Sequence, residues 1–206
     1  MKSLVYFFYK GIRKIFRLFF NYFDFFRLKV FLFMYDIKHK KIIANGLPFF
    51  HIAKNTSFHI GDNFKMNNGL VYNPIGFPQP CTFVVTSGAK LTIGNNVGMS
   101  QTTIVCQDSI VIKDFVKFGG GVKIYDSDFH SLKAEERMDS VMDMKNKGKA
   151  PVVIGNHVFV GANSMILKGV TIGDNSIVGA GAVVTKDIPE NQIWAGNPAK
   201  FIKSIG

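Results

Sequence analysis

Residues 154–184 read IGNHVFVGANSMILKGVTIGDNSIVGAGAVV. Within this stretch an apolar, β-branched residue recurs at every sixth position, namely Ile154, Val160, Ile166, Ile172, Val178 and Val184. A helix repeats every 3.6 residues and a half-buried strand every 2, so a spacing of six fits neither alone. The period predicts a solenoid of short strands and tight turns, in which each coil buries its apolar residue against the next.

Weaker copies of the same repeat lie earlier in the chain. Phe58–Asn63 (FHIGDN) is the first recognisable copy, and the period resumes at Ile93. It slips by one residue near Cys106–Ser109, which predicts a bulge or longer turn there. The Pro-rich segment Asn73–Pro80 predicts a loop that leaves the coil. The charged segment 125–150 breaks the repeat altogether, and loops of that length are usually functional or disordered.

Two motifs accompany the repeat, IYDSDFHSLKAEER at Ile124–Arg137 and WAGNPAK at Trp194–Lys200. With the period of six they resemble the hexapeptide-repeat acyltransferases. From about Ile93 the chain is similar to the maltose/galactoside O-acetyltransferase branch, and most of all to enzymes that acetylate capsule and lipopolysaccharide sugars. The resemblance implies an all-β solenoid, a left-handed parallel β-helix with three hexapeptides per coil, assembled as a homotrimer. We expect a basic aromatic helical extension over residues 1–41, the β-helix over 42–188 with a protruding loop at 125–150, and a tail over 189–206.

The composition separates the first segment from the rest. Only two cysteines occur, Cys81 and Cys106, in no metal-like or paired spacing, which favours a reducing compartment over a disulfide framework. The formal charge of +11 is uneven, because residues 1–41 carry +8 and the remaining residues +3. The basic character therefore belongs to the first segment, which also holds about half of the 21 phenylalanines.

The segment 1–41 is both aromatic and basic. Its uncharged runs, such as Leu18–Phe23, fall far short of the roughly 18–20 residues that span a bilayer, and no signal peptide is expected. A helix with Phe, Tyr and Leu among Lys and Arg fits an element that lies on a membrane surface, where anionic lipid attracts the cations. The alternative is that the aromatics pack on the solenoid or on a neighbouring subunit.

Nucleic acid is a weaker candidate partner, since this many phenylalanines would leave an apolar patch on a soluble binder. We expect a cytoplasmic protein that lies peripherally on the inner face of the membrane.

The resemblance makes His130 the catalytic base, because in the family an active-site His follows an Ile-Tyr strand and precedes an Arg by seven residues, as His130 precedes Arg137. A sugar hydroxyl is a weak acid, so its attack on a thioester needs a base, and an imidazole suits that role near neutral pH. The second ring nitrogen needs a partner that fixes the tautomer, and Asp128, Asp126 or a backbone carbonyl are the candidates. The alternative is a solvated His in a polar loop, which the flanking motif disfavours.

The resemblance also implies how acetyl-CoA, the acyl donor, is held. The backbone amides of Ala162 and Ala180 meet the pantetheine arm in a groove between two subunits. Thr185 and Lys186 contact the far end of CoA. Lys200 lies near the nucleotide phosphates, where relatives often carry Arg, and supplies a point charge without the bidentate fork. The alternative for the small residues is that coil geometry alone requires them.

Acceptor contacts are assigned by position. Ser100 and Gln107 lie near the places where maltose/galactoside enzymes have polar sugar contacts, and Asp126 is a third candidate. The Asn and Asp of those enzymes are missing here, so we expect a different sugar. The basic run 145–149 would suit an acidic sugar or a pyrophosphate linkage, although such a run is more often a solvated loop.

No metal site is expected, because the five histidines show no ligand-like spacing inside the repeat of the kind that zinc enzymes with this fold need. We predict an acetyl-CoA-dependent O-acetyltransferase that acts by direct transfer on a sugar hydroxyl of a surface polysaccharide or its lipid-linked precursor. The rivals are an N-acetyltransferase of an amino sugar nucleotide and a non-catalytic, membrane-tethered scaffold. His130 together with WAGNPAK argues against the scaffold.

Overall fold

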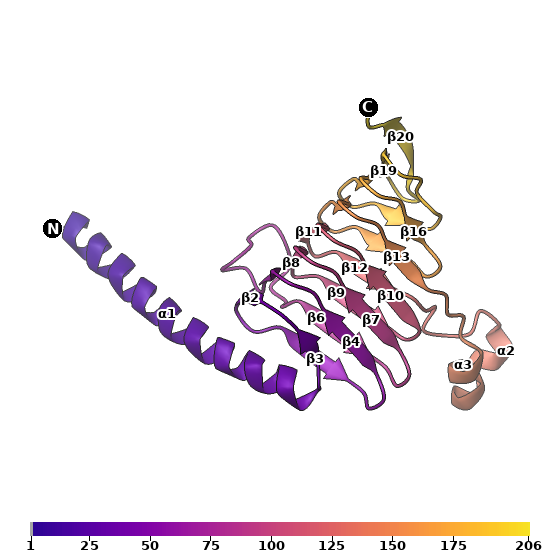
Figure 1. Cartoon of the computed structure of the whole chain (residues 1–206), viewed down its shortest axis with the longest axis horizontal. Coiled ribbons are helices and arrows are strands. Elements are labelled where there is room, and N and C mark those ends of the chain that lie inside the picture. The colour runs from indigo at the N-terminus through magenta and orange to yellow at the C-terminus, as the bar shows by residue number, and fades with distance from the viewer. Residues whose placement is uncertain (1) are drawn as a thin grey trace.

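The computed structural model describes the backbone of residues 2–206 and the side chains of residues 5–16 and 18–206. Figure 1 shows a long helix that leaves a three-sided solenoid at one end, with a helical loop protruding on the other side. The helices are α1 (Lys2–Met34), α2 (Ala134–Arg137) and α3 (Ser140–Asn146).

Three sheets form the faces of the solenoid, and consecutive strands from β1 to β18 enter them in turn. Sheet A consists of β1 (Lys38–His39), β4 (Ser57–Ile60), β7 (Lys90–Ile93), β10 (Ser109–Ile112), β13 (Val152–Ile154) and β16 (Thr171–Ile172). Sheet B consists of β2 (Ile42–Asn45), β5 (Phe64–Asn67), β8 (Gly98–Ser100), β11 (Lys117–Gly120), β14 (Phe159–Val160), β17 (Ile177–Val178), β19 (Gln192–Ala195) and β20 (Lys200–Ser204). Sheet C consists of β3 (Phe49–Ile52), β6 (Thr82–Val85), β9 (Thr103–Cys106), β12 (Lys123–Tyr125), β15 (Met165–Ile166) and β18 (Val183–Val184).

The residues at every sixth position form the core. All six between residues 154 and 184 have no exposed surface. In sheet A, Ile154 pairs in parallel with Ile172, and the equivalent partners in the other two sheets are also eighteen residues apart. Three hexapeptides therefore complete one coil, and the predicted left-handed parallel β-helix is confirmed.

The two predicted irregularities of the repeat can be compared with the structure. Ile93 pairs with Ile112, nineteen residues on, whereas Ile154 pairs with Ile172, eighteen residues on, so the coil that contains Cys106–Ser109 has the one extra residue that the slip predicts. Between β5 and β6 the described chain forms no strand, in agreement with the loop expected at Asn73–Pro80.

The corner between sheets A and B is held by a ladder of short polar side chains. Each one after the first accepts the backbone N–H of the equivalent residue in the preceding coil, at 2.6–3.2 Å. The ladder alternates carboxylate and amide, in the order Asp62, Asn95, Asp114, Asn156 and Asp174. Alternation keeps every carboxylate beside a neutral neighbour, which avoids repulsion between like charges stacked on adjacent strands.

The residue after each ladder position has a positive φ, which Asn tolerates better than most residues. At two coils this corner residue is Phe115 or His157 instead of Asn, and their rings stack at 4.7 Å. The corner thus keeps its geometry even where the sequence departs from Asn.

The end of α1 covers the open first coil of the solenoid. Leu28 and Leu32 are buried there, and the ring of Phe31 lies 6.4 Å from that of Phe50. The solenoid begins at β1, so its start precedes the expected boundary at residue 42. Within the described residues, no helix combines the length and the apolar character that crossing a membrane requires.

The segment 189–206, expected as a tail, instead extends sheet B. Strand β19 pairs in parallel with β17, and β20 folds back antiparallel on β19. The WAGNPAK motif spans the end of β19, the turn and the first residue of β20, so its two ends are held by the sheet.

Candidate functional site

The protruding loop leaves β12 of sheet C and returns to β13 of sheet A. Its neck is closed by backbone hydrogen bonds from Asp128 N to Gly148 O (2.9 Å) and from Ala150 N to Asp126 O (3.0 Å). Beyond the neck the chain forms α2 and α3, and the side chain of Asp139 caps α3 by accepting two of its free N–H groups. The break in the repeat is therefore an ordered element.

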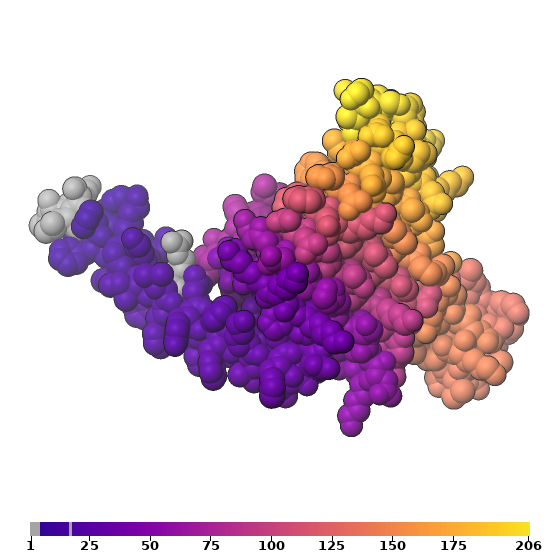
Figure 2. All heavy atoms as spheres, viewed as in Figure 1, coloured from indigo at the N-terminus to yellow at the C-terminus, as the bar shows by residue number. Residues whose placement is uncertain are grey.

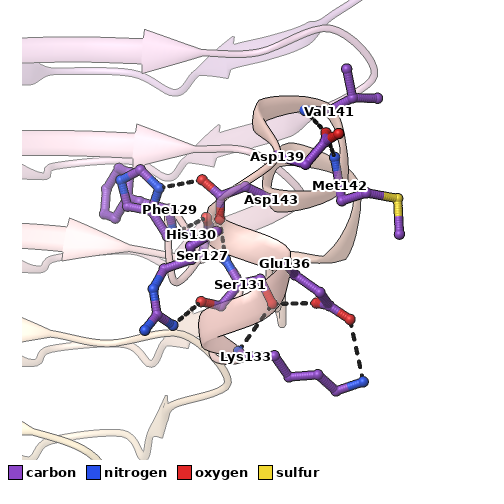
Figure 3. Close-up of polar contacts among 11 residues, drawn as sticks. Ser127, Phe129, His130, Ser131, Lys133, Glu136, Asp139, Val141, Met142 and Asp143 are labelled. Carbon is purple, nitrogen blue, oxygen red and sulfur yellow. Dashed lines mark hydrogen bonds and ion pairs between the residues drawn. The ribbon is translucent and has the colours of Figure 1, made fainter.

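His130 faces α3 inside this loop, as Figure 3 shows. Its Nδ1 lies 2.7 Å from Oδ2 of Asp143, whose other oxygen accepts the N–H of Ser131 at 2.7 Å. A carboxylate only accepts hydrogen bonds, so Nδ1 is the donor, and in the neutral ring Nε2 keeps its lone pair. The His130 side chain is 67% exposed and that of Asp143 only 11%, so the ring stays open to a substrate while its partner is shielded.

The same contacts keep the carboxyl group of Asp143 ionised. The hydrogen bond from His130, followed by that from the Ser131 N–H, holds the pKa of Asp143 below its usual range. Asp143 is therefore an anion at neutral pH, and it can stabilise an imidazolium that forms when His130 takes a proton.

A second set of contacts fixes the backbone beside the base. Arg137 donates from Nη1 to the carbonyl oxygen of Ser131 at 2.8 Å, and the Ser131 hydroxyl donates to Glu136. Glu136 also forms an ion pair with Lys133 at 3.2 Å. The spacing of seven residues between His130 and Arg137 thus has a structural meaning here, because the guanidinium of Arg137 holds the peptide that follows the base.

The assignment of Asp128 or Asp126 as the ring partner of His130 is corrected by this geometry. Asp128 lies 3.4 Å from the Nζ of Lys168, and Asp126 accepts the backbone N–H of Gln107 at 2.7 Å. Both carboxylates belong to the neck, where they turn toward neighbouring coils. Asp126 is also fully buried, so it offers no surface to an acceptor, and that second assignment is corrected as well.

Asp143 is the residue that the sequence interpretation missed. An indirect signal was present, because Asp139 followed by Ser-Val-Met is a helix start and places Asp143 in the first turns of a short helix. No local pattern shows that this helix folds back on His130.

The other candidate residues lie at two corners of the solenoid. Ser100, Ala162 and Ala180 lie at the corner between sheets B and C, whereas Gln107, His130, Thr185 and Lys186 lie at or beside the corner between sheets C and A. The two groups are at opposite ends of the sheet C strands. Lys200 is exposed at the start of β20, beyond both corners.

The two remaining acceptor candidates are Ser100, which is buried, and Gln107, which is partly exposed. Ser100 is only 7% exposed, and its hydroxyl accepts from Asn67 Nδ2 at 3.1 Å. The carbonyl oxygen of Gln107 accepts from Lys149 Nζ at 3.0 Å. The side-chain oxygen of Gln107 is buried without a hydrogen-bond partner among the described residues.

The small residues at the corner between sheets B and C have a structural reason. A Cβ on Gly161 would lie 2.5 Å from the backbone nitrogen of Ala180, and one on Gly119 would lie 2.5 Å from that of Ala162. Close stacking of the coils therefore requires glycine at these two positions, as the alternative interpretation held. Within the described chain, the amides of Ala162 and Ala180 donate to no backbone carbonyl, which leaves two donors at this corner.

The two thiols are unsuited to act as nucleophiles. Both are buried, and burial raises the pKa of Cys81 to about 12 and that of Cys106 well above its ordinary value. In the part of the chain that the structure describes, no group of three or more His, Cys, Asp or Glu side chains is arranged to hold a metal ion.

Comparison with known proteins agrees with this architecture. A family model described as "Hexapeptide repeat of succinyl-transferase" matches residues 151–186. The galactoside O-acetyltransferase of Escherichia coli K12 is 32% identical over 158 residues, which cover 77% of this chain and 59% of that protein. WbbJ of the same organism, provisionally named a lipopolysaccharide biosynthesis O-acetyl transferase, is 31% identical over 157 residues, or 74% of each chain.

Among solved structures, a point mutant of AntD, an N-acyltransferase from Bacillus cereus, in complex with dTDP and coenzyme A, superposes with a TM-score of 0.65. The alignment covers 82% of this chain and 84% of AntD at 20% identity, which supports the fold alone. The chain spans about three fifths of the length of several curated relatives, such as the galactoside enzyme.

Proposed function

Because this chain belongs to the hexapeptide-repeat acyltransferase family, in the branch of the galactoside and maltose O-acetyltransferases, we propose that it transfers acetyl from acetyl-CoA to a sugar hydroxyl. The observation that carries the proposal is the pairing of the exposed His130 with the shielded Asp143 at 2.7 Å. A solvated loop histidine would need neither an oriented ring nor a capped helix that supplies its partner.

The chemistry follows from the proton positions. Nε2 of His130 removes the proton of the acceptor hydroxyl as its oxygen attacks the thioester carbonyl, and the resulting imidazolium is stabilised by Asp143. When the C–S bond breaks, His130 returns that proton to the departing thiolate. The protein gains and loses no atoms, and the raised pKa values of the buried thiols support direct transfer without an acyl-enzyme.

The site requires more than one copy of the chain in this proposal. The base and the small-residue corner lie at opposite ends of the sheet C strands, so a homotrimer in which the His130 loop of one subunit faces the Ala162 and Ala180 corner of the next would unite them. In this arrangement the free amides of those two residues would hold the pantetheine arm. Thr185, Lys186 and Lys200 supply exposed polar and basic groups for the nucleotide end.

The acceptor that we propose is a hydroxyl of a surface polysaccharide or of its lipid-linked precursor. The similarity to WbbJ over 74% of both chains supports this class. The aromatic and basic helix α1 supports a place on the inner face of the membrane, where a lipid-linked sugar would be within reach.

The test is thiol release from acetyl-CoA in the presence of a panel of sugars, nucleotide sugars and capsule fragments. We expect acceptor-dependent release by the wild type and a loss of roughly 100-fold or more in His130→Ala. His59→Ala is the matched control, because His59 is exposed on β4 and lies outside the protruding loop. Equal rates in the His130 and His59 variants would refute the assignment of the base, and the absence of acetyl-CoA binding would favour a scaffold.

A further inference from the structure

Helix α1 exposes large apolar side chains around most of its circumference. Phe7 is 77% exposed, Tyr22 77% and Phe33 87%, and Figure 2 shows the N-terminal part of the helix standing away from the body. A helix that is apolar on all sides is normally buried, and an exposed apolar surface of this size marks an interaction site. Something therefore covers α1.

A groove on this helix has a defined chemistry. A cavity of about 780 Å³ lies between α1 and the Val71–Tyr72 turn of the loop that joins β5 to β6. The hydroxyl of Tyr72 donates to the side chain of Asn21, which holds the turn against the helix. Among the described side chains, the cations lining the cavity are Lys10, Arg13 and Lys14, and aromatic rings of the helix, among them Phe16 and Phe20, complete its wall. We call this cavity the α1 groove.

The groove is strongly positive. Arg13 and Lys14 follow Lys10 by three and four residues, so each of them neighbours Lys10 on the helix surface. The only acidic residue of α1 is Asp24, which lies 3.9 Å from Arg27, outside the groove. None of the three groove cations forms an ion pair with a described carboxylate, and two of them lie over tyrosine rings of the helix itself.

We propose that the α1 groove binds the phosphate headgroup of an anionic membrane lipid while the aromatic surface of α1 lies in the membrane interface. Arginine and lysine bind phosphate by charge-assisted hydrogen bonds, and aromatic side chains favour the interface. A free phosphate would need the cations but not the aromatic rings around them. This inference rests on the membrane location proposed above, and it names the ligand of the helix and the residues that select it.

A second copy of the chain is the competing occupant. A helix with ten basic and two acidic residues in and just after it, over residues 1–41, would meet the same positive charge on its partner. An anionic bilayer complements that charge, which is why the observations favour lipid.

The experiment measures partitioning of the full chain onto phosphatidylcholine vesicles with and without phosphatidylglycerol. One variant removes the groove cations (Lys10→Gln, Arg13→Gln, Lys14→Gln). The control removes three exposed lysines outside the groove (Lys38→Gln, Lys40→Gln, Lys41→Gln), so that both variants lose the same charge. Thermal melting of both variants checks the fold.

We expect the groove variant to bind phosphatidylglycerol vesicles roughly 100-fold more weakly than the wild type and the control variant to lose less than about 10-fold. Equal losses of vesicle affinity in the two variants would mean that lipid attracts the positive charge of the helix in general, and would refute binding in the α1 groove. Competition by inorganic phosphate would show a small-ion site, and concentration-dependent self-association through α1 without vesicle binding would show that a second copy covers it. Vesicle binding needs no acetyl transfer, so a failure here is distinct from a failure of the proposed activity.

Discussion

Replacing Asp143 by Asn tests the role of the residue that the sequence interpretation missed. The substitution keeps the size of the side chain and can keep the hydrogen bond from the N–H of Ser131, but it removes the negative charge 2.7 Å from Nδ1 of His130. The amide also has donors of its own, so it no longer enforces a proton on Nδ1. The fraction of His130 with a free lone pair at Nε2 should fall, and the imidazolium should lose its counter-charge.

The expected effect lies below that of removing the base. General base catalysis contributes about 10²–10⁴-fold, so His130→Ala should lose that much and Asp143→Asn a substantial share, about 10–100-fold in kcat. The KM for acetyl-CoA should stay within about threefold, because Asp143 is shielded and acts through His130. In the His130→Ala background, Asp143→Asn should have almost no further effect, since residues that act as a unit are not additive.

The assay is steady-state thiol release with the best acceptor of the panel. Asp139→Asn is the control, because it makes the same chemical change in the same loop while Asn still caps α3. Activity of Asp143→Asn equal to that of Asp139→Asn would refute the positioning role. So would a full additional loss in the double variant, which would indicate that Asp143 acts independently of His130.

Three further outcomes follow from the corner ladder and the coil stacking. Asn156→Asp would make three consecutive ladder positions carboxylates, from Asp114 to Asp174, and would remove the donor to Asp174. The free energy of unfolding at neutral pH should therefore fall by about 1–2 kcal/mol, and this loss should shrink on acidification. The side-chain hydrogen bond from Asn156 is the main cause that holds the pKa of Asp174 below its usual range. A carboxyl group with a lowered folded pKa adds stability above its unfolded pKa of about 3.9 and loses it as pH falls through the folded value. The melting temperature of the wild type should therefore fall more steeply below about pH 4 than that of Asp174→Asn, and parallel curves would contradict this reasoning. Gly161→Ala would place a Cβ 2.5 Å from the backbone nitrogen of Ala180. The free energy of unfolding in denaturant should therefore fall by about 1–3 kcal/mol. An unchanged denaturant midpoint would mean that the coils separate more easily than the structure implies.

The repeating strands could be predicted from the sequence because their period of six residues is visible in it. A β-branched residue at every sixth position predicts a solenoid of short strands, whereas the three hexapeptides per coil and the handedness came from the family resemblance. Even the one-residue slip near Cys106–Ser109 corresponds to a coil with one extra residue in the structure. Asn at the corner positions, such as Asn175, also follows a local rule, since the turn demands a positive φ.

The site was less predictable because its contacts are not local. His130 could be singled out by its motif, but its partner Asp143 is thirteen residues away on a helix whose direction depends on the Arg137 and Glu136 contacts with Ser131. Nearness in sequence favoured Asp128, yet pairing across the neck turns that carboxylate toward Lys168. Likewise, the sequence showed that α1 is aromatic and basic, but not that a loop from another coil meets it at Tyr72.

The most direct test of the account is to identify the product formed from isotopically labelled acetyl-CoA by the wild type and by His130→Ala. We predict that the wild type forms an acetyl ester on a sugar hydroxyl, which mild alkali removes. His130→Ala should bind acetyl-CoA normally and form almost none of the ester. An alkali-stable amide product, or an ester formed at the wild-type rate without His130, would contradict the account.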